Sequence, residues 1–343
     1  MIRRKTILVT GANGEVGHGL IQQLAAQPNK PAIIALDLKE LDSDLRPFVY
    51  RSVIGDILDN KMLERLTTEY EIETIFHLAA LLSTSSEFNP ESAHAVNVQG
   101  TVNLLKLAID QGRWSGQSVK FIYASSIAAY GLPNLETKRA AGRVTEDQYL
   151  NPTTMYGCNK LYCEHLGRYY ALHYQQLSAL RSVGVDFRCV RFPGLVSAMT
   201  VPTGGTSDYA PEMLHAAAQG HPYACFVRVD TTIPFMAMPD AIKALLTLAN
   251  APRENLTHFV YNVTSFSRSA KEFSEMVKAA FPNAQITFET SYSRQAIVDT
   301  WPADMDDSAA RRDWGWSPDY DADRAFNDYL IPTISQRYKV NAE

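Results

Sequence analysis

The stretch KTILVTGANGEVG, residues 5–17, decides the fold of this chain. Residues 5–10 form an apolar run of strand type, and residues 15–27 carry apolar side chains at helical spacing. Between them, Gly11, Gly14 and Gly17 are spaced G-x-x-G-x-x-G. Glycines at a strand-to-helix turn let backbone N–H groups approach a phosphate, which then faces the helix N-terminus. The stretch therefore predicts the opening strand, turn and helix of a phosphate-binding fold.

Apolar runs and amphipathic stretches alternate along the rest of the N-terminal half. We predict further strands at residues 32–36, 74–78, 119–124 and 185–191, and long helices at 90–110 and 155–174. Strands that alternate with helices form a parallel sheet with helices on both faces. The sequence thus predicts an α/β fold with a Rossmann-type doubly wound parallel sheet.

The pattern changes after Phe192, where glycine and proline interrupt shorter helices and strands. We expect a dinucleotide-binding domain over residues 1–192, completed by residues 232–263. Residues 193–231 and 264–343 are expected to form a smaller C-terminal substrate lobe. The stretch 133–152 is polar and charged, so we expect a surface loop there.

Asp37 indicates which phosphate compound the turn holds. It follows the second predicted strand, about 20 positions after Gly17, where a carboxylate accepts hydrogen bonds from adenosine ribose hydroxyls. A carboxylate there repels the 2′-phosphate of NADP, although Lys39 offsets part of that repulsion. The sequence therefore favours NAD. We expect these residues to contact it: Gly11, Asn13, Gly14, Glu15, Val16, Gly17, Asp37, Leu38, Asp56, Ile57, Leu78, Ala79, Ala80, Asn97, Tyr156, Lys160 and Phe192.

Tyr156 and Lys160 lie four residues apart in a predicted helix, so their side chains share one face. A cation about 4 Å from a phenolate stabilises it by about 4 kcal/mol at an effective dielectric of 20. That is the size of effect a tyrosine needs to act as a base near neutral pH. Ser126 ends a predicted strand, and chemistry in such folds lies at the carboxyl ends of strands. We predict Ser126, Tyr156 and Lys160 as the catalytic set, with Ser125 as a helper.

Composition narrows the remaining classes. The formal net charge of the 343 residues is −5, and no basic stripe is present for nucleic acid. No run of about 18 apolar residues predicts a membrane span, and we expect a cytoplasmic protein. The four cysteines, Cys158, Cys163, Cys189 and Cys225, form no C-x-x-C pair or cluster with histidine, so we expect no metal site.

Together the glycine turn, Asp37, Ser126, Tyr156 and Lys160 resemble the extended short-chain dehydrogenase/reductase superfamily, which includes nucleotide-sugar epimerases and dehydratases. Five later stretches are similar to short-chain-type L-threonine 3-dehydrogenases. They are HLAALLS at 77–83, PTGGTSDYA at 202–210, PFMAMPDA at 234–241, WPADMDDS at 301–308 and DWGW at 313–316. The resemblance spans nearly the whole chain.

The resemblance implies an NAD-dependent oxidoreductase of threonine catabolism. The β-hydroxyl of L-threonine would be oxidised to 2-amino-3-ketobutyrate, with the hydride passing to NAD and the proton to Tyr156. The implied substrate-facing residues are Ser83, Ser125, Ser126, Tyr156, Thr206, Ser207, Asp208 and Trp301. It also implies a homodimer paired through the helices at 90–110 and 155–174.

Three features depart from the family pattern, and two alternatives stay open. The chain reads Thr206-Ser207 where two threonines are usual, residues 84–87 are unusually polar, and the stretch 133–152 is long. One alternative is a nucleotide-sugar epimerase or dehydratase, with phosphate-binding candidates Arg228, Arg253, Arg268 and Arg294. The other is a non-enzymatic NAD-binding sensor, because fold does not fix function.

Overall fold

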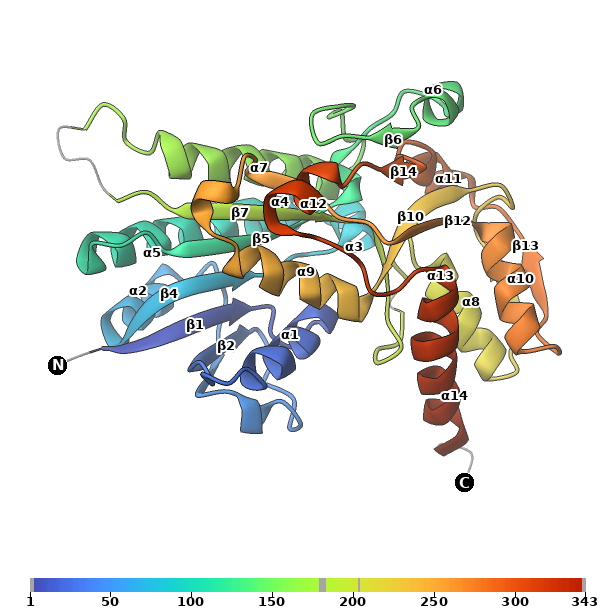
Figure 1. Cartoon of the computed structure of the whole chain (residues 1–343), viewed down its shortest axis with the longest axis horizontal. Helices are drawn as coiled ribbons and strands as arrows, with labels where there is room; N and C mark the ends of the chain where they lie inside the picture. Colours follow the sequence, from blue (N-terminus) through green and yellow to red (C-terminus); the bar gives the residue numbers. More distant parts are fainter. Residues whose placement is uncertain (1–2, 179–182, 203, 341–343) are drawn as a thin grey trace.

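A seven-stranded parallel sheet forms the centre of the computed structural model, which describes residues 3–178, 183–202 and 204–340 (Figure 1). The strand order is β11-β7-β5-β4-β1-β2-β3, and every neighbouring pair is parallel. The strands are β1 (Arg4–Thr10), β2 (Ile33–Asp37), β3 (Arg51–Ile54), β4 (Tyr70–His77), β5 (Lys120–Ser126), β7 (Asp186–Phe192) and β11 (Val260–Asn262). The order reverses beside β1, so the predicted doubly wound Rossmann-type sheet is confirmed.

Helices cover both faces of this sheet. One face packs against α2 (Asn60–Glu69), α5 (Gly100–Ser115) and α7 (Met155–Leu172). The other packs against α1 (Glu15–Ala25), α9 (Met238–Asn250) and α12 (Ser308–Trp314). Successive strand residues point to opposite faces, so Leu8 is buried under the first set and Val9 under the second. Burial on both sides explains why the strands read as continuous apolar runs.

The predicted helix at 90–110 contains an irregularity that the sequence pattern did not indicate. It begins as α4 (Pro90–His94), widens into a π-helical turn η2 (Ala95–Gln99) and continues as α5. The carbonyl of Asn97 accepts hydrogen bonds from the Thr101 hydroxyl at 2.6 Å and the Cys163 thiol at 3.3 Å. Side-chain donors at a carbonyl perturb the regular helical ladder at this turn.

A second lobe packs at one end of the sheet, on the right in Figure 1. Its three-stranded sheet consists of β8 (Gly194–Val196), β10 (Thr232–Ala237) and β12 (Phe266–Ser269). Around it lie α8 (Tyr209–Ala218), α10 (Ala270–Ala280), α11 (Tyr292–Asp299), α13 (Ala322–Arg324), α14 (Ile331–Val340) and the paired strands β9 (Tyr223–Cys225) and β13 (Ile286–Phe288). Its core is rich in aromatic rings, with Phe235 and Phe273 at 4.7 Å between centroids. The division of the chain into two domains by residue number stays a proposal.

The expectation of a surface loop at 133–152 is wrong. The stretch contains α6 (Leu135–Ala140) and β6 (Arg143–Val144), which pairs with β14 (Asp304–Met305). Lys138, Val144 and Glu146 are buried, at 6%, 0% and 7% exposure. The Lys138 ammonium donates to the Val298 carbonyl at 3.0 Å, and Glu146 accepts from the Asn262 amide at 2.9 Å. Charged side chains can be buried when backbone groups satisfy their hydrogen bonds, so the polar composition of the stretch led to a wrong prediction.

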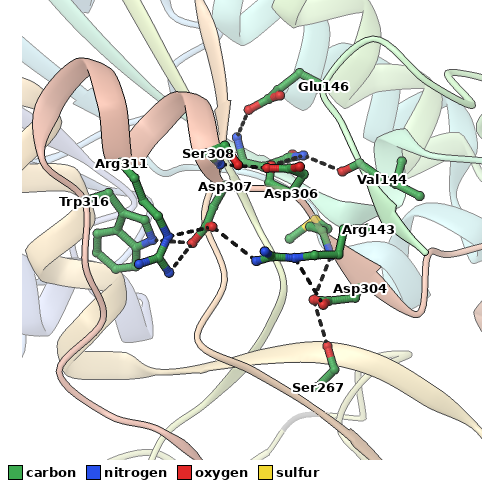
Figure 2. A network of polar contacts seen from close by, with 12 residues as sticks. Arg143, Val144, Glu146, Ser267, Asp304, Asp306, Asp307, Ser308, Arg311 and Trp316 are labelled. Carbon is green, nitrogen blue, oxygen red and sulfur yellow. Dashed lines mark hydrogen bonds and ion pairs between the residues drawn. The ribbon is translucent and has the colours of Figure 1, made fainter. Parts of the chain in front are cut away.

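Asp307 holds this stretch to the C-terminal part of the chain. Its carboxylate is fully buried and accepts hydrogen bonds from Arg143 at 3.4 Å, from Arg311 at 2.8 Å and from the Trp316 indole at 3.1 Å (Figure 2). Arg143 lies 164 positions before Asp307, whereas Arg311 and Trp316 follow it within nine positions. The contact with Arg143 therefore ties the 133–152 segment to the C-terminal part of the chain.

A buried ion pair joins α7 to the sheet. The Arg191 guanidinium donates to both oxygens of Glu164, at 2.8 and 2.5 Å, and both side chains are at most 3% exposed. The Ser125 hydroxyl donates to the same carboxylate at 2.5 Å, and Arg191 also donates to the Glu146 carbonyl at 2.7 Å. These hydrogen bonds of Glu164 and Arg191 therefore all go to other groups of the protein.

We predict that Glu164→Gln lowers the free energy of unfolding by about 3–5 kcal/mol, because Arg191 is left as an uncompensated buried charge. Urea unfolding followed by circular dichroism measures the loss. The matched control is Glu275→Gln, which removes an exposed pair with Lys271 at 3.7 Å and should cost about 1 kcal/mol or less. Equal effects of the two substitutions would contradict the prediction.

Candidate functional site

A cavity of about 650 Å³ opens at the carboxyl ends of the central strands, between the sheet and the second lobe. Its walls come from the turns after β1, β2, β4 and β5, from the start of α7, and from segments after β7. This is where ligands bind in doubly wound sheets. All the residues that the sequence predicted for cofactor or substrate line it, except Asn97.

The glycine turn leaves no room for side chains. A Cβ at Gly11 would lie 2.7 Å from the Ala79 amide nitrogen, and Gly11 has φ +68°. A Cβ at Gly17 would lie 2.5 Å from the carbonyl oxygens of Gly11 and Ala12. The turn therefore packs directly against the segment that follows β4, and α1 begins at Glu15 with its N-terminus at the cavity. This cradle fits a pyrophosphate, because backbone amides and the helix dipole both favour negative charge.

The Asp37 carboxylate is held in place at the end of β2. Its two oxygens accept from the backbone amides of Asn13 at 3.0 Å and Lys39 at 3.1 Å. Two acceptor positions stay free on the oxygens, facing a cavity wall that includes the exposed Leu38. Asp56 accepts from the Leu58 amide at 2.9 Å, next to the buried Ile57. This end of the cavity fits an adenosine, with carboxylate for its hydroxyls and apolar side chains for its ring.

Asn97 acts behind the wall. Its side-chain amide accepts from the Leu81 amide at 2.8 Å and donates to the Leu81 carbonyl at 3.0 Å. Leu81 itself lines the cavity. Asn97 is 2% exposed and therefore holds the segment after β4 from the side that faces away from the cavity.

Tyr156 and Lys160 come from the first turns of α7. Thr154 caps this helix by accepting from the Gly157 amide at 3.0 Å. The Lys160 ammonium donates to the Ala124 carbonyl at 2.6 Å and lies 5.3 Å from the centre of the Tyr156 ring. The cation is 3% exposed, so little water screens it from the ring. The structure therefore places a buried cation beside the Tyr156 ring, inside the cavity wall.

The two serines at the end of β5 have different partners. The Ser126 hydroxyl accepts from the Ala128 amide at 3.2 Å, which leaves its proton free for a ligand in the cavity. The Ser125 hydroxyl donates its hydrogen bond to the Glu164 carboxylate. Of the two, Ser126 is the one that can donate to a substrate oxygen.

The other end of the cavity is lined by hydroxyls and one carboxylate. The Thr206 hydroxyl donates to the Ser83 hydroxyl at 3.2 Å, and the Gly205 amide donates to Asp208 at 2.7 Å. Ser207 and Trp301 complete the predicted set on this wall. These groups can bind a small polar ligand.

Trp301 is held by the 133–152 segment and its neighbours. The Leu132 amide donates to the Thr300 carbonyl at 2.7 Å, and Lys138 donates to the Val298 carbonyl. Burial lowers the pKa of Lys138 to about 8, although the nearby Asp299 counteracts it. The 133–152 segment thus supports the part of the cavity wall that carries Trp301.

The sequence reasoning missed several wall residues. They follow β7 and are Pro193, Leu195, Ser197, Thr200, Val201 and Pro202. Their position directly after a strand that ends at the cavity is the signal that could have found them.

The cavity wall is acidic. Its described ionisable side chains are Glu15, Asp37, Asp56, Asp208, Tyr156 and Lys160, so carboxylates outnumber cations. Glu15 is open to the cavity, yet the surrounding protein raises its pKa to about 7, and the charge of Asp208 adds to the effect. Glu15 therefore changes charge near neutral pH.

Comparisons with known proteins bear on this site. The model of the NAD dependent epimerase/dehydratase family matches residues 7–264. The mitochondrial L-threonine 3-dehydrogenase of Bos taurus is 34% identical over 322 residues, which cover 93% of this chain and 80% of the relative. The structure of a monomeric L-threonine 3-dehydrogenase from a metagenome has a TM-score of 0.83 at 36% identity, covering 97% and 99% of the two chains. The UDP-glucose 4-epimerase of Thermotoga maritima has a TM-score of 0.77 over 98% and 99% of the chains, but at 18% identity it shares the fold alone.

We predict that NAD binding weakens as pH rises through about 7. Glu15 is protonated below this pH and ionised above it, and its charge then repels a pyrophosphate at the N-terminus of α1. The dissociation constant should rise about fivefold between pH 5.5 and 8.5, or roughly 1 kcal/mol for one charge at a helix terminus. Isothermal titration calorimetry measures it.

Glu15→Gln should remove most of this pH dependence and bind NAD at pH 8.5 as the wild type does at pH 5.5. The exposed Glu254→Gln is the control and should keep the wild-type profile. A Glu15→Gln variant with an unchanged profile would show that another group titrates.

Proposed function

The chain belongs to the NAD dependent epimerase/dehydratase family, and we propose that it is an L-threonine 3-dehydrogenase, a proposal that its similarity to enzymes of that name supports. It is an NAD-dependent oxidoreductase, and its glycine cradle and Asp37 fit that cofactor. The observation that carries the choice of substrate is the cavity wall around Thr206 and Asp208. It offers hydroxyls, one carboxylate and the indole of Trp301 to a small molecule.

In the proposed reaction the β-hydroxyl of L-threonine is oxidised to the ketone of 2-amino-3-ketobutyrate. The glycine cradle and Asp37 would hold NAD, which would supply the acceptor for the hydride of the β-carbon. Ser126 donates a hydrogen bond to the reacting oxygen, and Tyr156 takes the hydroxyl proton as the base. Lys160, fixed by the Ala124 carbonyl, stabilises the ionised Tyr156.

The substrate's own charges match the far wall. A carboxylate can accept hydrogen bonds from the hydroxyls of Ser83 and Ser207, while Thr206 orients Ser83, and Asp208 attracts the ammonium. Trp301, which is 4% exposed, closes this side and restricts the size of the substrate. A small zwitterion thus finds a partner for each charged group.

The four arginines considered for a nucleotide sugar are engaged elsewhere and lie outside the described cavity wall. Arg228 donates to both oxygens of Asp299 at 2.8 and 2.9 Å. Arg294 lies 4.3 Å from the centre of the Phe226 ring. Arg253 and Arg268 donate to the carbonyls of Leu256 and Ser267. At the substrate end of the described wall, a diphosphate would meet the Asp208 carboxylate and none of these arginines, which disfavours this alternative.

The test is NADH formation at 340 nm with NAD and L-threonine, L-serine, 3-hydroxybutyrate or a UDP-hexose. We expect turnover with L-threonine, and Tyr156→Phe should lower kcat by about 10²- to 10⁴-fold because the proton acceptor is lost. Tyr162→Phe, an exposed residue of the same helix, should leave kcat unchanged.

Two results would refute the proposal. One is no absorbance change at millimolar L-threonine. The other is wild-type turnover by Tyr156→Phe, which would show that Tyr156 is not the base. Binding of NAD without turnover of any of the four compounds would favour a non-enzymatic NAD-binding sensor.

We further propose that two copies of the chain pair through α7. Tyr162, Tyr169 and Leu172 are 53%, 41% and 52% exposed and, by their spacing, share one face of this helix. Exposed apolar stripes of this kind mark protein interfaces. We expect a homodimer in analytical ultracentrifugation, converted to a monomer by Leu172→Arg. Tyr292→Arg, at an 89% exposed site on α11, should leave the mass unchanged. A wild type that sediments as a monomer, like the monomeric metagenome enzyme, would contradict this proposal.

The cytoplasmic location stays a prediction. Among residues 3–178, 183–202 and 204–340, no helix has the length and apolar character of a membrane span. The Bos taurus relative is named as mitochondrial.

A further inference from the structure

The polar run at residues 84–87, which departs from the family pattern, lies in the short helix α3 (Ser83–Phe88) at the cavity edge. The helix lies between two parts of the proposed active site. One is the substrate-facing segment 204–208, and the other is the start of α7 with Tyr156. Polar side chains of α3 form hydrogen bonds to the segment 204–208 and to the start of α7.

The base of α3 is rigid. The Ser86 hydroxyl is fully buried and donates to the Leu81 carbonyl at 3.0 Å. Leu81 is in turn held on both its amide and its carbonyl by Asn97 of the π-helical turn. α3 therefore has a fixed origin on the nucleotide-binding side of the cavity.

The first arm of α3 reaches the substrate-facing segment. The Thr84 hydroxyl donates to the Gly204 carbonyl at 2.9 Å, and Ser83 accepts from Thr206 at 3.2 Å. Gly204 has φ +85°, a conformation that glycine adopts without strain. The Gly204 carbonyl also accepts from Arg294 at 3.3 Å, so one peptide carries contacts from α3 and α11.

The second arm reaches the helix that carries Tyr156. The Glu87 carboxylate accepts from the Met155 amide at 2.7 Å. Met155 is the first residue of α7 and directly precedes Tyr156. Thr154 caps the Gly157 amide, so Glu87 satisfies a second free N–H of the same turn. A negative charge there also favours the helix dipole.

We propose that α3 couples the substrate-facing segment 204–208 to the position of Tyr156, with Thr84 and Glu87 as positioning residues. The inference rests on the proposed function, in which Tyr156 takes the substrate proton. Thr84 positions the substrate-facing segment through its hydrogen bond to the Gly204 carbonyl, and Glu87 positions the first turn of α7 through the Met155 amide. Because both side chains leave one short rigid helix, a displacement at either contact moves the other.

The kinetic test compares variants at each arm. Glu87→Ala should lower kcat about ten- to a hundredfold, because a small misplacement of a reacting group is costly, while the Kd for NAD stays within about twofold. Glu87→Gln keeps an acceptor for the Met155 amide and should restore most of kcat. Glu91→Ala, at an exposed residue of the neighbouring α4, is the matched control and should behave as the wild type.

Thr84→Val should raise KM for L-threonine, and Thr84→Ser should restore it. In the double variant Thr84→Val/Glu87→Ala, the loss in kcat/KM should be smaller than the product of the two single losses. Independent multiplication of the losses, or wild-type kcat in Glu87→Ala, would overturn the coupling.

Amide hydrogen exchange gives a readout that does not depend on the reaction. Glu87→Ala should speed exchange at Met155 and Tyr156, and Thr84→Val should do the same although it lies on the other arm. Unchanged exchange at Met155 in Thr84→Val would refute the coupling even if L-threonine is turned over. Faster exchange in both variants without L-threonine turnover would support the coupling and refute the proposed substrate.

Discussion

The buried contact between Glu164 and Arg191 organises the catalytic end of the molecule. Glu164 belongs to α7, which also carries Tyr156 and Lys160, while Arg191 belongs to β7. The same carboxylate accepts a hydrogen bond from the Ser125 hydroxyl and so fixes the strand end that presents Ser126. Arg191 continues to the Glu146 carbonyl in the 133–152 segment. One ion pair thus joins α7, the central sheet and the 133–152 segment. Because both charges are buried, removal of either one leaves the other without a partner and destabilises the fold.

Much of the fold and of the cavity wall followed from local patterns. The glycine turn is readable because steric exclusion acts between near neighbours, as at Gly17 and Ala12. The strands are readable because burial on both faces demands continuous apolar runs. The carboxyl ends of these strands bring Asp37, Ser126 and the alanines after β4 to one edge of the sheet. This placement follows from the strand pattern alone, without knowledge of side-chain contacts.

What the sequence did not reveal depends on contacts between distant residues. Lys138 reads as a surface lysine until Val298, 160 positions later, supplies its acceptor. Asn97 reads as a cofactor ligand, whereas the structure turns its amide toward Leu81. The partner of Glu87 is an amide on another helix. In each case the side chain's chemistry was clear from the sequence, but its partner is set by how the chain folds back on itself.

The contact between β6 and β14 has a consequence for how the protein is made. Strands β1 to β5 can begin to pair as the chain leaves the ribosome, because their partners are close in sequence. The wall with Trp301 forms only when residues near 304 meet Arg143, and Asp307 gains its donors later still, when Arg311 and Trp316 have been synthesised. During elongation the residues of the nucleotide end of the cavity therefore leave the ribosome before those of the substrate end are complete. The wall that meets the substrate is the last part of the site for which all residues become available.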